Sequence, residues 1–114
     1  MTPDQEIENR REFGQEIARE LYRIYRLADE RARSGNIFMI LQFCDMDSIL
    51  RSEDHTFIAG KIMDFYENPF LSLHPLPALA KRVQPFMPGD KMQEDVKSAM
   101  MEELVHVRKQ IAAR

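Results

Sequence analysis

Apolar and polar positions divide this chain into helical segments separated by glycine and proline. Between residues 4 and 34, apolar residues recur every three or four positions, the period of an amphipathic helix with one apolar stripe. Thr2, Pro3 and Gln5 are typical of a helix start, and Gly35 is typical of a helix end. The pattern therefore predicts one long N-terminal helix.

The middle of this helix has the spacing of a short coiled-coil seam. Its two cleanly apolar heptads place four residues at seam positions: Ile17, Leu21, Ile24 and Ala28. A helix of about 31 residues is about 46 Å long, whereas a compact domain of this size is roughly 35 Å across. We expect about two turns to extend beyond the body, and the seam to contact another protein or a second copy of the chain, as in a homodimer.

Four shorter helices are predicted to follow, at about 37–50, 53–67, 77–86 and 91–112. Residues 37–50 are nearly all apolar, so periodicity alone does not separate a buried helix from a buried strand. Because no other segment offers a partner strand, we interpret them as a buried central helix. Ser52 is predicted to start the next helix, and Asp90 with Gln93 the last one. The predicted fold class is all-α, a small bundle of four to five helices with one long N-terminal helix, forming a single domain over residues 1–114.

Composition limits the classes of function. A formal net charge of −3 disfavours a general binder of nucleic-acid phosphates, which would normally be basic. Cys44 is the only cysteine, so it forms no internal disulfide, and we expect a cytoplasmic location. No run of about 18 apolar residues predicts a membrane span, and residues 1–9 are acidic and polar, unlike a secretory signal.

Arginines form a second stripe on the long helix, at Arg19, Arg23, Arg26 and Arg33. Such a stripe is compatible with a nucleic-acid-associated subunit. Acidic residues share the same face, however, and Glu6–Arg10 and Asp29–Arg33 have the spacing of helix ion pairs. We therefore interpret the stripe as a solvated face, and count Arg19, Arg23 and Arg26 among the candidate interface residues.

A possible catalytic motif follows the apolar run 37–41. The segment Asp45-Met46-Asp47-Ser48 resembles the first motif of haloacid-dehalogenase-type phosphatases, in which a hydrophobic strand precedes two aspartates. The resemblance implies Asp45 as nucleophile, Asp47 as general acid/base and a Mg²⁺ ion bound by both. Ser48 stands where the family has Gly, Ile49 stands where it has Thr or Val, and no later segment predicts a parallel strand. A small Mg²⁺-dependent phosphatase is therefore the alternative interpretation.

One further pair of residues has a spacing found among metal ligands. Glu103 and His106 have the spacing of half a di-iron signature, but the chain contains no second such pair. His106 also lies off the apolar stripe of its helix, so we expect it in solvent. We predict no metal and no cofactor.

The sequence as a whole favours a small protein without catalytic activity. We expect it to act through protein–protein contact, as an adaptor, an accessory subunit, a chaperone-like protein or an inhibitor. The apolar surplus and the long first helix support this interpretation.

Overall fold

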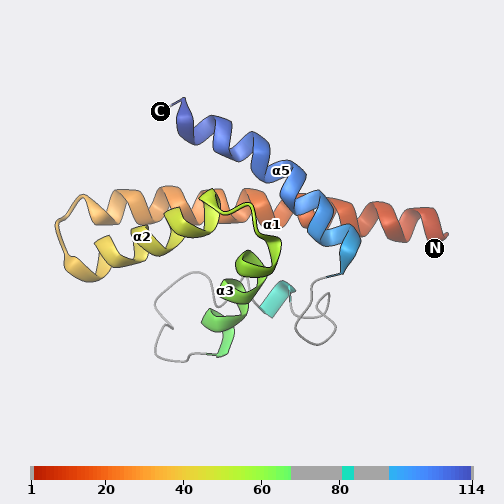
Figure 1. Cartoon of the computed structure of the whole chain (residues 1–114), viewed down its shortest axis with the longest axis horizontal. Helices are drawn as coiled ribbons and strands as arrows, with labels where there is room; N and C mark the ends of the chain where they lie inside the picture. The colour runs from red at the N-terminus through yellow and green to blue at the C-terminus, as the bar shows by residue number, and fades with distance from the viewer. Residues whose placement is uncertain (1, 68–80, 84–92, 114) are drawn as a thin grey trace.

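A computed structural model describes residues 2–67, 81–83 and 93–113 (Figure 1). These residues form α1 (Pro3–Ala32), α2 (Ile37–Arg51), α3 (His55–Glu67) and α5 (Glu94–Ala112), with a helical turn at 81–83. The predicted all-α fold, a small bundle with one long N-terminal helix, is confirmed. The rest of the predicted helix 77–86, and Asp90, lie outside the described residues. Each helix in the described ranges is too short or too polar to cross a lipid bilayer.

The ends of α1 follow from local hydrogen bonds that its sequence predicts. The Thr2 side chain accepts a hydrogen bond from the Gln5 amide at 3.2 Å, and the Gln5 side chain accepts one from the Thr2 amide at 3.4 Å. This reciprocal pair satisfies amide groups that have no partner inside the helix. Gly35 ends the segment with φ 80°, a conformation that residues with a side chain rarely adopt.

α2 folds back along the C-terminal half of α1, as Figure 1 shows. Asn36 begins α2, because its side chain accepts hydrogen bonds from the amides of Phe38 and Met39. The rings of Tyr25 and Phe43 lie 5.3 Å apart between the two helices. The prediction of a helix for 37–50 therefore agrees with the structure.

α3 and α5 begin two to three residues later than predicted. Asp54, and not Ser52, caps α3, since its carboxylate accepts from the amides of Thr56 and Phe57. Ser52 instead accepts a hydrogen bond from the Asp54 amide. Gln93 occupies the cap position of α5, but its side chain makes no capping hydrogen bond. The start of α3 is set by which side chain reaches the free amides, a detail that spacing alone leaves open.

α5 crosses the N-terminal half of α1 obliquely, and Gly14 lies at the crossing (Figure 1). A methyl group on Gly14 would collide with the carbonyl oxygen of Val96 and would lie 3.0 Å from the Ala99 side chain. The missing side chain thus allows the two backbones to approach closely. Ion pairs flank the crossing, with Arg10 contacting Asp95 at 2.9 Å and Arg11 contacting Glu102 at 2.5 Å.

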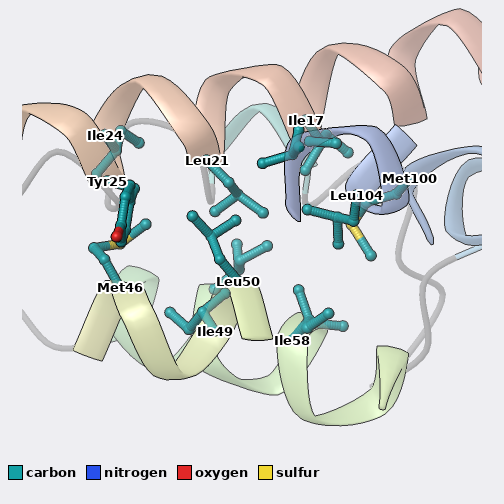
Figure 2. Packing of buried hydrophobic residues seen from close by; sticks show 14 of the residues in the cluster. Ile17, Leu21, Ile24, Tyr25, Met46, Ile49, Leu50, Ile58, Met100 and Leu104 are labelled. Atoms are coloured by element: carbon teal, nitrogen blue, oxygen red, sulfur yellow. The ribbon is translucent and has the colours of Figure 1, made fainter. Parts of the chain in front are cut away.

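One hydrophobic core joins all the described helices and the turn at 81–83. Figure 2 shows Leu21 of α1, Leu50 of α2, Ile58 of α3 and Leu104 of α5 pointing toward one another. All four are fully buried. The predicted stripe of the last helix is also buried, at Val96, Met100, Leu104 and Val107.

The first two turns of α1 extend beyond the other helices. The molecule measures 50 × 34 × 22 Å, and a 30-residue helix is about 45 Å long. Residues 2–9 are all exposed, and Ile7 is 40% exposed although it lies on the apolar stripe. Arg10 then pairs with Asp95 of α5, and not with Glu6 as the spacing predicts.

Candidate functional site

The four predicted seam residues of α1 lie inside the protein's own core. Ile17, Leu21 and Ile24 are at most 1% exposed, and Ala28 is 6% exposed. They pack against α2, α3 and α5, so the folded chain offers none of them to a second chain. A contact through α1 would have to use the other side of this helix.

That other side carries the three predicted arginines, all of them exposed. Arg19 contacts Glu103 of α5 at 3.4 Å, and Arg23 Nε donates to Glu20 at 3.0 Å. This hydrogen bond lowers the pKa of Glu20 and raises that of Arg23. The Arg26 guanidinium lies 5.9 Å above the Tyr22 ring. Carboxylates and an aromatic ring thus accompany the arginines, as expected of a solvated face.

The two aspartates of the phosphatase-like motif lie on a helix, and this corrects the strand that the resemblance implies. Asp45 and Asp47 are two positions apart on α2, so their side chains point in directions about 200° apart. Asp47 accepts a hydrogen bond from Arg51 at 2.8 Å, which raises the pKa of Arg51, whereas Asp45 is exposed. Carboxylates diverging in this way do not share one cation.

Glu103 and His106 lie about one turn apart on α5. Glu103 pairs with Arg19, and His106 is exposed, as predicted. Among the described residues, no three His, Cys, Asp or Glu side chains converge as a metal site would require.

The largest departure from the sequence interpretation is the outer side of α2. The sequence predicts a buried central helix here, but three large apolar residues in the first half of α2 are exposed: Phe38 by 71%, Ile37 by 59% and Leu41 by 54%. Burial is confined to Met46, Ile49 and Leu50 in the second half. From Ile37 to Ser48 the exposed positions of α2 are Ile37, Phe38, Leu41, Cys44, Asp45 and Ser48, which we call the α2 face.

These residues are exposed because the neighbouring helices cover only part of α2 in the described structure. In the described structure, α2 contacts α1 along one side and meets α3 and α5 only near its C-terminal end. Residues 37–41 are apolar on every side of the helix, so their pattern could not show which of them would remain uncovered. The signal available in the sequence was the row of polar residues Asp45, Ser48 and Arg51, which continues along the exposed side of the helix.

A shallow hollow of about 490 Å³ continues the α2 face at its C-terminal end. Its lining residues are Ser48, Arg51, Ser52, Asp54 and Phe57. Ser48 belongs to both surfaces, so the hollow and the exposed apolar residues lie along one side of the helix. Phe57 is 36% exposed and supplies an apolar wall.

Comparisons of the chain with protein-family models, with curated proteins and with solved structures found no match.

Proposed function

We propose that this protein acts by binding another polypeptide chain through the α2 face, without catalysing a reaction. The observation that carries the proposal is the exposure of Ile37, Phe38 and Leu41, three large apolar side chains within five consecutive positions. Scattered apolar residues are normal on protein surfaces, but adjacent ones often mark a contact site.

The free energy of burying these side chains favours a protein partner. Full burial of a large apolar side chain contributes about 1.5–3 kcal/mol, so covering these three would contribute several kcal/mol before the costs of association. Phe38 is also the kind of residue that dominates binding energy in protein interfaces. The protein would then work as an adaptor, an accessory subunit, a chaperone-like protein or an inhibitor. The exposed thiol of Cys44 suits a reducing compartment such as the cytoplasm.

Cys44 provides the test, because it is the only cysteine and lies on the α2 face. A photoreactive benzophenone maleimide attached there should yield, after illumination in an extract of the native host, a discrete cross-linked polypeptide. Phe38→Ser should remove the product. The matched control carries Cys44→Ser and Gln110→Cys, which moves the probe to an exposed position on α5.

Equal products from both probe positions, or no product from Cys44, would contradict the proposal. Adduct mass then identifies the captured chain.

A further inference from the structure

We infer that the α2 face binds the α2 face of a second copy of this chain, with the two helices antiparallel about a two-fold axis near Leu41 and Cys44. This inference rests on the proposed function and specifies the partner. In such an interface the same surface serves both subunits, so every contact occurs twice. The face must therefore be complementary to itself.

The spacing of the α2 face provides that complementarity. Ile37, Leu41, Cys44 and Ser48 are all exposed and follow one another at intervals of four, three and four, the spacing of a helix-pairing seam. The seam has two large residues at one end and two small ones at the other. Antiparallel packing sets Ile37 against Ser48 and Leu41 against Cys44 of the second copy. Large residues then meet small ones throughout, whereas parallel packing would set large against large.

The hollow accommodates the most exposed side chain. Ile37 and Ser48 are 11 positions apart, or about 16 Å along the helix. Antiparallel packing therefore brings Ile37 and Phe38 of one copy over the hollow beside Ser48 of the other. Phe38 is the most exposed large apolar residue in the described part of the chain, and the hollow offers it the Phe57 ring.

Charge favours the same direction of packing. Arg31 and Arg33 precede the Ile37 end of the face, and Glu53 and Asp54 lie at the end with the hollow, where Arg51 is already paired with Asp47. Arg31 and Glu53 are exposed, and within the described residues neither forms an ion pair. Antiparallel helices place the arginine end of one copy beside the acidic end of the other, at both ends of the interface. Parallel helices would place like charges together.

The size of the face predicts a weak dimer. A stable interface buries about 800 Å² on each partner, more than one side of a 15-residue helix provides. Association should therefore depend on concentration and be reversible.

Sedimentation equilibrium of the full chain tests the inference. From about 10 to about 500 µM, the weight-average mass should rise from 13.4 kDa toward twice that value. Leu41→Glu should raise the dissociation constant at least about tenfold, because it buries an unpaired charge at the centre of the seam. Val105→Glu, on an exposed apolar residue of α5, is the matched control and should leave the mass unchanged.

A charge exchange tests the direction of packing. Arg31→Glu and Glu53→Arg should each raise the dissociation constant by about threefold to tenfold, because the dimer contains each pair twice. The double variant should restore the dimer, because the exchanged charges attract each other again. A short bis-maleimide should also join Cys44 of the two copies, which lie within about one turn of each other at the axis. Ile37→Cys in a Cys44→Ser background should not cross-link, and adding Ser48→Cys should restore cross-linking.

The two proposals fail in different ways. A wild-type mass of one chain at the highest concentration overturns the second-copy inference, as does a dimer that Leu41→Glu leaves intact. If the Cys44 probe then captures a different protein in extract, the proposed function stands with that protein as the partner. If it captures nothing, both proposals are wrong.

Discussion

Gly14 on α1 lies against the backbone of Val96 on α5, where a side chain of even one carbon would collide with the Val96 carbonyl oxygen. α1 crosses α5 at this point, and the ion pairs Arg10–Asp95 and Arg11–Glu102 lie beside it. The glycine is thus required by the crossing and not by any turn, since it lies within α1.

Gly14→Ala should therefore destabilise the protein by about 1–3 kcal/mol, as is usual when a packed core is overfilled. In an ordinary helix the same change would stabilise by up to about 1 kcal/mol, so the sign of the effect is informative. Gly60→Ala on α3 is the matched control, because nothing lies within 4 Å of the added methyl, and it should stabilise. Urea unfolding followed by circular dichroism measures both, and a neutral or stabilising Gly14→Ala would contradict the close crossing.

Arg108 of α5 should contribute to stability by closing the end of α2. Its Nε donates to the Leu50 carbonyl at 2.8 Å, and its guanidinium also contacts the Ser52 carbonyl. These carbonyls lie past the last helical hydrogen bonds of α2, and a charged donor satisfies them. We expect Arg108→Met to cost about 1–3 kcal/mol in unfolding free energy. Arg19→Met removes only an exposed ion pair and should cost less than about 1 kcal/mol. If both variants lost the same unfolding free energy, the contact of Arg108 with the end of α2 would add no stability beyond that of a surface ion pair.

Leu21 and Leu41 should respond differently to the same substitution. Leu21 is fully buried among four helices, so Leu21→Glu places an unpaired charge in the core and should abolish cooperative unfolding. Leu41 is 54% exposed, and Leu41→Glu should leave the circular dichroism spectrum unchanged. Thermal melts measure both. A folded, monomeric Leu21→Glu variant would restore the interpretation of this stripe as an intermolecular seam.

The α2 aspartates should have no part in phosphate chemistry. Purified protein with Mg²⁺ is expected to hydrolyse an aryl phosphate no faster than buffer, because Asp45 and Asp47 diverge on a helix and Asp47 is paired with Arg51. A colorimetric assay checks this. Turnover that Asp45→Asn removes, with the fold unchanged, would show that the helical geometry had been misinterpreted.

Glu20 should make a small, pH-dependent contribution to the free energy of unfolding. The hydrogen bond from Arg23 lowers the pKa of this carboxyl below its ordinary value of 4.5, so folding favours the ionised form. The contribution is present above the ordinary pKa and is lost as the pH falls through the lowered one. Glu20→Gln should cost at most about 0.5 kcal/mol in unfolding free energy at pH 7, since the pair is largely solvated, and this cost should shrink as the pH falls below 4.5. Urea unfolding at a series of pH values tests this, and a cost that does not change with pH would rule out the ion pair as its source.

Local interactions account for what could be read from the sequence by itself. The limits of α1 follow from Thr2, Gln5 and Gly35, whose effects act within a few residues. The stripes of α1 and α5 repeat every three or four positions, and the structure buries their central residues. The Asp29–Arg33 ion pair was also predictable, because four positions on a helix bring two side chains together at 3.3 Å.

Tertiary structure alone decided which apolar surface is covered. The stripe of α1 could have met a second chain or its own chain, and the later helices cover it. Residues 37–41 at the start of α2 are apolar on every side of the helix, so their composition was compatible with full burial. In the part of the chain that the structure describes, the neighbours of α2 reach one side and one end of it, and Ile37, Phe38 and Leu41 are exposed. Burial depends on how many elements surround a segment, and that number is a property of the packed chain, which no periodicity within 15 residues encodes.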